Sequence, residues 1–488
     1  MATTKTAIPS KATRRPSRGA RRPDPVTAYV EAVRDGKIVA GRYVRLACLR
    51  HLRDLEESAR GVNGLTWSWP HAKHAIEFFP TFLRLGDGTP FELHPFQVFK
   101  TGCIFGWLGP DGRRRFRRVY DEEAKGQGKT PWLAGLLLYS ITCDEQLDAE
   151  CYVAAVTREQ ARLMFEDARK MALASPDLQR VLIIGQNAIT HPESKSFVKP
   201  ISSEGRSLDG KRVQVAAIDE VHEHRTSFVV DKLAAGRKHR KEPLIVEITN
   251  SGSDRQTICW RHHEYVARIL EGAVRDDEWF GIICGLDVCE ECRAAGKDMP
   301  QEGCPRCDNW RDERVWPKAN PLLGTTVQPS YLRAQVREAI NMPAQANIVK
   351  RLNFCIWTQT HSKWLDVGQW IACADELPAA ELEGRPCYAG LDLGQAEDLS
   401  AFVRAWILED GRIALAGRYR RRRSRSIPTV RISNGAMPGS CQSPANRRPT
   451  TTSWSGRSAS SASRAACSSS RTTDGSPVTW RFISRTSA

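Results

Sequence analysis

Residues Glu123 to Thr130 (EAKGQGKT) combine two glycines with an adjacent Lys-Thr pair, a combination that can bind phosphate. In such a loop Gly126 and Gly128 let backbone N–H groups wrap a phosphate chain. Lys129 would reach the terminal phosphates, and the Thr130 hydroxyl would hold Mg²⁺. The usual pattern, G-x-x-x-x-G-K-[ST], begins with a glycine, whereas this loop begins with Glu123. The loop alone is weak evidence and needs support from the rest of the chain.

A second signature is the carboxylate pair Asp219-Glu220, which follows the apolar run Val213 to Ile218. The run predicts a buried strand, which we expect to lie beside the strand that leads into the phosphate loop. In phosphate-loop ATPases the first carboxylate binds the Mg²⁺ shell and the second orients and deprotonates the attacking water. Asp219 and Glu220 are the candidates for these two roles.

Two further positions could contact a nucleotide. Thr249-Asn250-Ser251-Gly252 follows the predicted strand 244–249, and small polar residues beside a γ-phosphate can sense its loss. Gln97, in the segment His94-Pro95-Phe96-Gln97, could bind an adenine edge, because a carboxamide offers a donor and an acceptor together. Both positions also have an interpretation without function. Residues 249–252 would then be an ordinary turn at the end of a strand, and Gln97 an ordinary polar residue of a helix.

Four cysteines have the spacing of a metal site. Cys289-x-x-Cys292 and Cys304-x-x-Cys307 are separated by eleven residues, close to the spacing of a four-cysteine zinc ribbon. Four thiolates would close a tetrahedral Zn²⁺ site and leave no open position, which indicates a structural metal. Paired redox cysteines are the alternative.

The elements around these residues alternate between strand and helix. Strands are predicted at 117–121 and 151–156, each followed by a helix, the first over 131–140 and the second from Thr157 past Met171. Arg158 and Gln160 lie at the start of the second helix. They could contact a nucleotide or DNA, or they could simply be exposed residues of its first turn. The alternation predicts an α/β fold, a P-loop ATPase with a mostly parallel central sheet. Helices are also expected within 26–60.

The carboxyl-terminal part begins a different pattern. Tyr388 to Gly394 predicts a strand that carries Asp392 inward, and Asp398 follows. Residues 401–408 predict a second strand, Asp410-Gly411 a hairpin turn, and 412–418 the returning strand. A strand-borne Asp followed by a meander resembles the start of an RNase H-like nuclease, in which clustered carboxylates hold two Mg²⁺ or Mn²⁺ ions.

The 488 residues divide into five expected parts. They are a disordered basic arm at 1–25, the ATPase domain at 26–360 with the four-cysteine insertion at about 284–310, a linker at 361–385, the start of the nuclease at 386–419, and a disordered tail at 420–488. The segment 352–359 is expected to lead into the linker.

The net charge of +16 does not indicate nucleic-acid binding by the folded body. Residues 1–22 carry +7 and residues 419–488 carry +12, which leaves −3 for 23–418. The sequence shows no apolar run of about 18 residues and no signal peptide, so we expect a cytoplasmic protein without a membrane span. The 15 cysteines are therefore expected to be reduced thiols.

In this order the motifs resemble the large terminase subunit of tailed bacteriophages, over roughly residues 60–418. The likeness rests on HPFQ at 94–97, EAKGQGKT, Asp219-Glu220, TNSG at 249–252, WPKANP at 316–321 and GLDLG…DLSA at 390–401. That family often lacks the first glycine of the loop and has a basic residue early in it, a role that Lys125 would fill. The cysteine pairs are not required by the family and are interpreted as an insertion.

The resemblance implies a DNA-packaging motor that hydrolyses ATP with Mg²⁺ and cleaves concatemeric DNA. By it Gln97 contacts adenine, Lys129 and Thr130 contact the phosphates and metal, Asp219 holds Mg²⁺, and Glu220 activates water. The Thr249–Ser251 turn, with Thr249 and Asn250, would couple hydrolysis to DNA movement. Asp392, with Asp398 as a weaker candidate, would bind the nuclease metal. The implied partners are double-stranded DNA, a small terminase subunit, a portal protein and other copies in a ring, within the host bacterial cytoplasm.

Two other function classes remain open on the sequence. A DNA helicase or translocase without nuclease activity would explain the first 360 residues but not Asp392 on its strand. A zinc-ribbon DNA-binding protein would make the cysteines central and the phosphate loop accidental.

Residues from about Arg420 onward are predicted to be a shifted reading frame. Thirteen Arg and seventeen Ser occur in residues 419–488, with no Lys and one acid, and with no helix or strand periodicity. One allowed spelling of residues 427–439, read two bases later, encodes PDRPYLEWRDAG, which resembles a P-x-R-P-Y-x-x-W segment of the terminase nuclease. The later carboxylates of the two-metal site would then be missing. An ordinary basic tail is the alternative.

Overall fold

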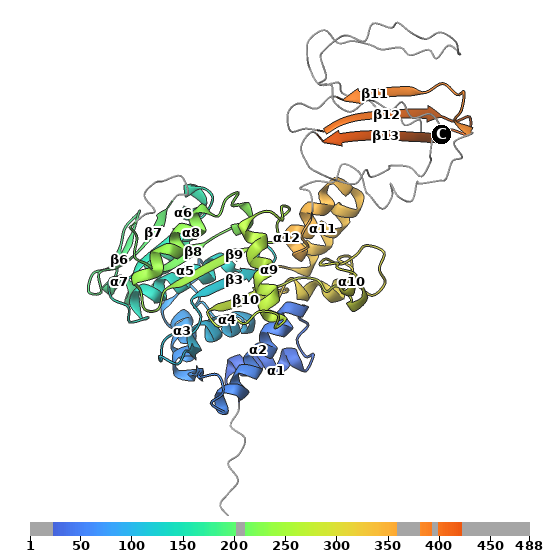
Figure 1. The fold of residues 1–488 in the computed structure, drawn as a ribbon. Helices are drawn as coiled ribbons and strands as arrows, with labels where there is room; N and C mark the ends of the chain where they lie inside the picture. Colours follow the sequence, from blue (N-terminus) through green and yellow to red (C-terminus); the bar gives the residue numbers. More distant parts are fainter. Residues whose placement is uncertain (1–22, 202–209, 359–380, 393–398, 422–488) are drawn as a thin grey trace, which may run out of the picture. The chain divides into compact units, whose positions relative to one another are not determined.

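The computed structural model describes residues 23–201, 210–358, 381–392 and 399–421 (Figure 1). These residues fall into two compact units, one within residues 1–366 and one within 367–488. Residues 1–22 of the predicted basic arm, residues 361–380 of the predicted linker, Asp398 and residues 422–488 of the predicted tail lie outside the described residues. The predicted bounds of the arm and the tail are corrected by a few residues, because Asp24 and Pro25 begin the first helix and Arg420 and Arg421 end the last strand. Among the described helices, none is both long and apolar enough to cross a membrane.

The first unit is built on an eight-stranded mixed sheet. Its strands are β3 (Arg118–Glu122), β4 (Glu150–Ala154), β5 (Ile183–Ile184), β6 (Ile189–His191), β7 (Ser196–Ile201), β8 (Val213–Ile218), β9 (Leu244–Thr249) and β10 (Trp279–Ile283). Their order is β10-β3-β9-β8-β4-β7-β6-β5, and six of them, β10 to β7, run parallel. A separate antiparallel pair joins β1 (Thr66–Trp67) to β2 (Trp107–Leu108).

The position of β8 corrects one expectation from the sequence. The strand that precedes Asp219-Glu220 does not lie beside the loop strand β3, because β9 pairs with both and separates them. All three strands are parallel, so their carboxyl ends still meet at one edge of the sheet. The segment after β9 is therefore the central one of the three.

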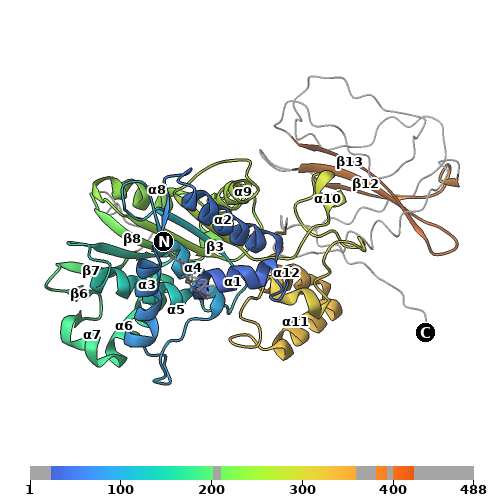
Figure 2. The same cartoon turned by 90° about the horizontal axis from the view of Figure 1, so that it is seen from below.

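Helices cover both faces of this sheet, with α5 and α6 on one side and α8 and α9 on the other (Figure 2). The α-helices are α1 (Pro25–Arg34), α2 (Arg42–Ala59), α3 (Trp69–Phe82), α4 (Pro95–Gly106), α5 (Lys129–Thr142), α6 (Arg158–Ala174), α7 (Pro176–Val181), α8 (Phe228–Ala235), α9 (Ile258–Leu270), α10 (Glu290–Ala294), α11 (Pro329–Asn341) and α12 (Ala346–Phe354). Short 3₁₀ turns lie at Val221–Glu223, Gly236–His239, Glu313–Lys318 and Pro343–Gln345. The predicted strands and helices of this part are thus confirmed to within a few residues.

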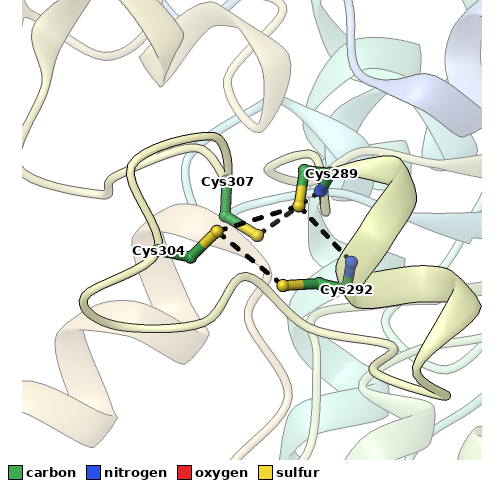
Figure 3. A group of neighbouring side chains, drawn as sticks. All are labelled: Cys289, Cys292, Cys304 and Cys307. Carbon is green, nitrogen blue, oxygen red and sulfur yellow. Dashed lines mark hydrogen bonds between the residues drawn. The ribbon is translucent and has the colours of Figure 1, made fainter.

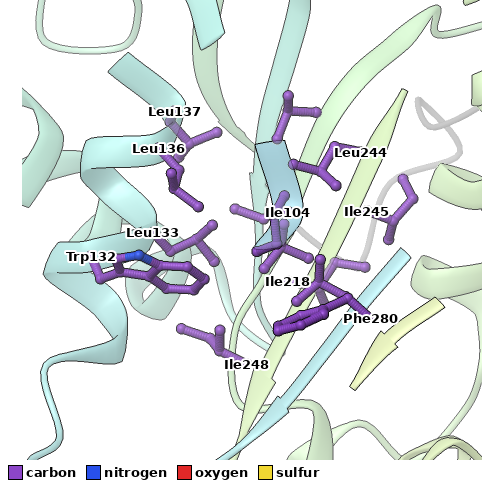
Figure 4. Close-up of a cluster of buried hydrophobic side chains, with 14 of the residues drawn as sticks. Ile104, Trp132, Leu133, Leu136, Leu137, Ile218, Leu244, Ile245, Ile248 and Phe280 are labelled. Atoms are coloured by element: carbon purple, nitrogen blue, oxygen red, sulfur yellow. The ribbon is translucent and has the colours of Figure 1, made fainter. Parts of the chain in front are cut away.

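The main core lies where α5 packs on the sheet (Figure 4). The helix is apolar around most of its circumference, with Trp132, Leu133, Leu136 and Leu137 all fully buried. Such a helix is stable only when neighbours cover every side, which fixes its N-terminus, and hence the end of the phosphate loop, firmly against the sheet.

The segment expected to lead into the linker belongs to the first unit instead. Residues 352–354 complete α12, and Trp357 is buried in the main core. The Trp357 indole donates a hydrogen bond to Glu122 Oε1 at 2.9 Å, at the carboxyl end of β3. The polar residues that follow this segment predict a connection, but the Trp357 side chain packs into the core and so keeps the segment with the first unit.

The second unit contains one antiparallel sheet in its described part. It is formed by β11 (Tyr388–Asp392), β12 (Leu399–Ile407) and β13 (Ile413–Arg421), in that order. The hairpin predicted at Asp410-Gly411 joins β12 to β13, with Gly411 at φ +82°. The three predicted strands are confirmed.

Candidate nucleotide site

The phosphate loop connects β3 to α5 as expected. Gly126 and Gly128 have φ of +83° and +69°, a region that side chains other than glycine rarely adopt. The ammonium of Lys129 donates to the carbonyls of Glu123 at 2.9 Å and Ala124 at 2.8 Å, so it spans the loop. Thr130 follows in the first turn of α5, whose N–H groups face the loop. This geometry suits an anion, because a helix N-terminus, free N–H groups and a cation converge.

Glu123, at the position of the missing first glycine, points beneath the loop. Its carboxylate is fully buried and contacts the buried ammonium of Lys100, which also pairs with Asp121 at 2.6 Å. Burial, and then the neighbouring Asp121 carboxylate, raise the pKa of Glu123 to about 8. The Lys100 ammonium also lies 4.1 Å from the centre of the Trp132 ring on α5. Glu123 therefore joins the loop to α4 through Lys100, and the same ammonium contacts α5.

The loop is also held from a distant part of the chain, which the sequence did not indicate. Gln127 is 1% exposed and donates from Nε2 to Asn320 Oδ1 at 3.0 Å, while its Oε1 accepts the Leu322 N–H at 2.8 Å. Asn320 lies in the WPKANP segment, which the sequence marked only as part of the resemblance. Lys125 itself is exposed, and its N–H donates to the Leu352 carbonyl at 2.8 Å.

The carboxylates after β8 are placed at the same sheet edge. The Asp219 N–H donates to the Ala154 carbonyl at 2.9 Å, and Asp219 Oδ1 accepts the Glu220 N–H at 2.8 Å. Burial, and then the Glu220 carboxylate, raise the pKa of Asp219 to about 6, while Lys129 acts in the opposite direction. The pair therefore shares an electrostatic environment with the loop lysine, as the motif requires.

Glu220 adopts an unusual backbone conformation, with φ +49° and ψ +50°. For a residue other than glycine this left-handed region costs about 1 kcal/mol or more and is found preferentially at functional sites. Its Oε2 is buried without a hydrogen bond, although His222 Nδ1 lies 3.2 Å away. A strained backbone thus holds a buried carboxylate oxygen that accepts no hydrogen bond from the described residues and has the His222 imidazole beside it.

His222 connects the carboxylates to the turn after β9. Its backbone N–H donates to Thr249 Oγ1 at 3.0 Å. Thr249, Asn250 and Ser251 are all buried, with at most 1% of their surface exposed. Because buried hydroxyl and amide groups need partners, this turn is more than a strand exit: its side chains connect β9 with the segment after β8 and with the end of α12.

The remaining nucleotide candidates divide into two kinds. Gln97 is 3% exposed, and its Oε1 accepts the His94 N–H at the start of α4. A Cβ added to Gly128 would lie 3.3 Å from Gln97 Nε2, so this amide borders the loop. Gln160 caps α6 together with Thr157, and Arg158 is exposed beside it, which matches the non-functional interpretation of these two residues.

The four predicted metal cysteines come together in space (Figure 3). The sulfurs of Cys289, Cys292, Cys304 and Cys307 all lie within 4.8 Å of one another. Cys304 Sγ is 3.7 Å from Cys292 Sγ and 3.8 Å from Cys289 Sγ, too far for disulfides. Backbone N–H groups of Arg306 and Cys307 lower the pKa of the Cys304 thiol to about 6. Four thiols at this spacing can close around one tetrahedral ion.

Asp392 ends β11 in the second unit, and its side chain is exposed rather than directed inward. The sheet around it presents large apolar side chains to solvent, among them Leu391 at 63% and Ile407 at 60% exposure. Alternation along a strand tells which residues share a face of the sheet. Whether that face is buried depends on a second layer that covers it. Asp398 lies outside the described residues.

Two family models match the chain. The ATPase domain of the terminase large subunit matches residues 95–268, and its endonuclease domain matches residues 302–418. The chain belongs to the terminase large subunit family. The terminase ATPase match contains the phosphate loop, Asp219-Glu220 and the Thr249 turn. The terminase nuclease match contains Asp392, β12 and most of β13.

Individual proteins are also similar to this chain. Protein YmfN of Escherichia coli (strain K12) is 32% identical over 209 residues, which are 42% of this chain and 42% of that protein. The large subunit of the terminase of Enterobacteria phage HK97 is 28% identical over 332 residues, 66% of this chain and 59% of that protein. The matched region thus spans roughly half the length of these relatives. The crystal structure of the HK97 bacteriophage large terminase aligns with a TM-score of 0.49 at 22% identity, over 71% of this chain and 67% of that one.

Proposed function

We propose that this chain is the ATP-hydrolysing subunit of a motor that moves double-stranded DNA into a viral procapsid and belongs to a system that cuts concatemeric DNA. The observation that carries the proposal is the meeting of three segments at one sheet edge: the phosphate loop after β3, Asp219-Glu220 after β8, and the Thr249 turn after β9. Membership of the terminase large subunit family supports DNA as the polymer that is moved.

In this proposal the loop binds the triphosphate. Lys129, now bonded to two carbonyls of its own loop, turns to the β- and γ-phosphates when they arrive, and the α5 N-terminus faces the same charge. Lys125, Gly126 and Gly128 border the phosphates. Gln97 binds adenine through Nε2, since its Oε1 is already occupied by the His94 N–H.

The donor set after β8 and in α5 fits a magnesium ion. Thr130 offers a hydroxyl and Asp219 a carboxylate, and hard oxygen ligands are those that Mg²⁺ prefers. A bound Mg²⁺ would neutralise charge on the β- and γ-phosphates. Glu220, whose Oε2 has no hydrogen bond, would accept a proton from the attacking water. Thr249 and Asn250 would transmit the loss of the γ-phosphate to α12, because their turn contacts the end of that helix.

Replacing Lys129 tests the ATPase. Lys129→Ala should reduce ATP hydrolysis by at least about 100-fold, because the terminal phosphates lose their closest cation. Lys170→Ala, which removes an exposed lysine from α6, should leave the rate unchanged and is the matched control. Equal hydrolysis by the wild-type chain and Lys129→Ala would refute the proposal.

We also propose that Cys289, Cys292, Cys304 and Cys307 bind one structural Zn²⁺. The cluster of sulfurs within 4.8 Å supports it, because four thiolates complete the tetrahedral shell that Zn²⁺ prefers. Protein purified without chelators should contain about one zinc per chain by elemental analysis. Cys304→Ser should lose the zinc, whereas Cys143→Ser, a half-buried cysteine outside the cluster, should keep it.

For the nuclease we propose an incomplete domain. Asp392 would be one metal ligand, with Asp398 as a further candidate, but one or two carboxylates cannot clamp both the attacking and the leaving oxygen. The endonuclease match ends at residue 418, where the composition changes, which supports a shifted frame from about residue 420. The coding DNA tests this directly: codons that encode no terminase-like segment in the shifted frame would refute it.

Catalytic assays test the same point independently. The chain as written should cut plasmid DNA with Mn²⁺ poorly or not at all, and a chain restored to the other frame should cut it. Cleavage by the present chain that is lost in Asp392→Asn would refute the incomplete domain.

The partners follow from the proposed motor. We expect the chain to engage double-stranded DNA, a small terminase subunit and a portal protein, and to form a ring of identical subunits, in the host bacterial cytoplasm. Hydrolysis that rises when double-stranded DNA and the procapsid portal are added would support these partners. Hydrolysis that is indifferent to both would contradict them.

A further inference from the structure

The end of α12 is held by three segments of the candidate nucleotide site. The Arg351 carbonyl accepts from Ser251 Oγ at 3.0 Å, and the Leu352 carbonyl accepts the Lys125 N–H at 2.8 Å. The Asn353 carbonyl accepts from Asn320 Nδ2 at 2.8 Å. The last carbonyls of a helix have no partner within it, and here the site supplies those partners. The last turn of α12 is therefore positioned by the loop, the turn after β9 and the WPKANP segment together.

This turn carries a buried arginine with a hydrogen-bond donor that no group in the described part of the chain accepts from. Arg351 is 6% exposed, and its Nε is buried without a hydrogen-bond partner. A buried guanidinium donor without a partner costs on the order of 1–3 kcal/mol, and such groups are rare unless a ligand completes them. Burial lowers the pKa of Arg351, while the charges of Glu223 and Glu220 act to raise it, so the guanidinium shares the environment of Glu220.

We infer that Arg351 contacts the γ-phosphate of ATP and stabilises the charge that develops during its transfer, as an arginine finger supplied from within the same chain. The inference rests on the proposed ATPase function. During hydrolysis the water oxygen bonds to the γ-phosphorus, and the bond from that phosphorus to the β–γ bridging oxygen breaks. The electron pair remains on the β-phosphate, and a water proton passes to Glu220. Arg351 donates hydrogen bonds to the transferred group, where negative charge is spread in the transition state.

A simpler role exists for an arginine at this place. Basic residues in the last turn of a helix offset the partial negative charge of its C-terminus. That role predicts a loss of stability and no selective loss of rate. A guanidinium that acts on the transferring phosphate predicts the reverse, so the two can be separated.

The test compares Arg351→Ala, Arg351→Lys and Arg337→Ala in the full chain. Arg337 is exposed on the adjacent helix α11 and controls for the loss of one arginine. We expect kcat for ATP to fall at least about 100-fold in Arg351→Ala with little change in the Kd for ADP, and Arg351→Lys to restore little, since a point charge lacks the planar fork. Binding of ADP with Mg²⁺ and aluminium fluoride should weaken in parallel with kcat, and Arg337→Ala should match the wild type.

Three results would overturn the inference. They are an Arg351→Ala rate within about twofold of wild type, a rate above wild type, and a loss of rate accompanied by an equal loss of ADP affinity and of Tm. Lys129→Ala, measured alongside, separates this from the proposed function. If the wild type hydrolyses ATP and Lys129→Ala does not, an unchanged Arg351→Ala refutes Arg351 alone. If the wild type shows no hydrolysis, the ATPase proposal fails first.

Discussion

Carboxylates in the two units have opposite surroundings. At the nucleotide edge, Asp121 and Glu123 are fully buried and share Lys100, and the Asp219 carboxylate accepts the Glu220 N–H. Asp392, on the described sheet of the second unit, is exposed among exposed apolar side chains. Burial changes what a carboxylate can do, because it shifts the pKa and fixes the geometry. The carboxylates of the first unit are thus held in fixed positions by buried partners, whereas Asp392 on the described sheet of the second unit is exposed to solvent.

The largest effect should come from Glu220. Glu220→Gln keeps the size of the side chain but removes the base, so kcat for ATP should fall by about 1,000-fold or more while ATP affinity stays nearly constant. Steady-state hydrolysis and a separate ATP-binding titration measure the two quantities. Normal hydrolysis by this variant would show that the strained backbone at Glu220 serves another purpose.

A large effect on folding is expected from Lys100. Lys100→Met removes the only cation bonded to Asp121 and Glu123 in the described structure, so buried negative charge remains unpaired. The free energy of unfolding should fall by about 3–5 kcal/mol. Urea denaturation of the full chain measures it, with Lys73→Met, an exposed lysine on α3, as the control. A decrease in the unfolding free energy below about 1 kcal/mol would mean that the cluster of Lys100, Asp121 and Glu123 does not hold the loop.

The pH dependence of stability tests Glu123. Its pKa is about 8 in the folded chain and near 4.3 when unfolded, so between these values the folded state binds more protons. The unfolding free energy should therefore decrease as pH rises through this window. Asp219, with a pKa of about 6, contributes mainly below pH 7.

Glu123→Gln isolates this contribution. The decrease in Tm between pH 6.5 and 8.5 should be smaller in Glu123→Gln than in the wild type, because the amide does not titrate. Glu290→Gln, at a side chain that is 91% exposed, should follow the wild-type profile. Parallel profiles for all three proteins would contradict the buried, protonated state of Glu123.

The smallest effect should come from Asp392. Asp392→Asn removes an exposed carboxylate, so the unfolding free energy should change by less than about 0.5 kcal/mol. The same denaturation measurement serves for this variant. A larger change would show that Asp392 has buried partners in the folded chain, and the contrast between the two units would then fail.

The sequence by itself determined the features that depend on neighbours along the chain. The EAKGQGKT loop, the strand before Asp219-Glu220, the cysteine pairs and the Asp410-Gly411 hairpin were all predictable, because turn geometry, strand alternation and ligand spacing are local properties. The sequence also shows Glu123 as a departure from the usual loop, but it does not show that this side chain pairs with Lys100.

Only the tertiary structure decided how distant residues complete the site. Lys100 lies 23 residues from Glu123, Asn320 lies 193 from Gln127, and Ser251 lies 100 from Arg351. No periodicity or spacing links such residues, because their contacts arise from the order of strands in the sheet and from the packing of α4 and α12. The insertion of β9 between β3 and β8 has the same origin: strand order depends on which pairings bury the most surface, and that is a property of the whole fold.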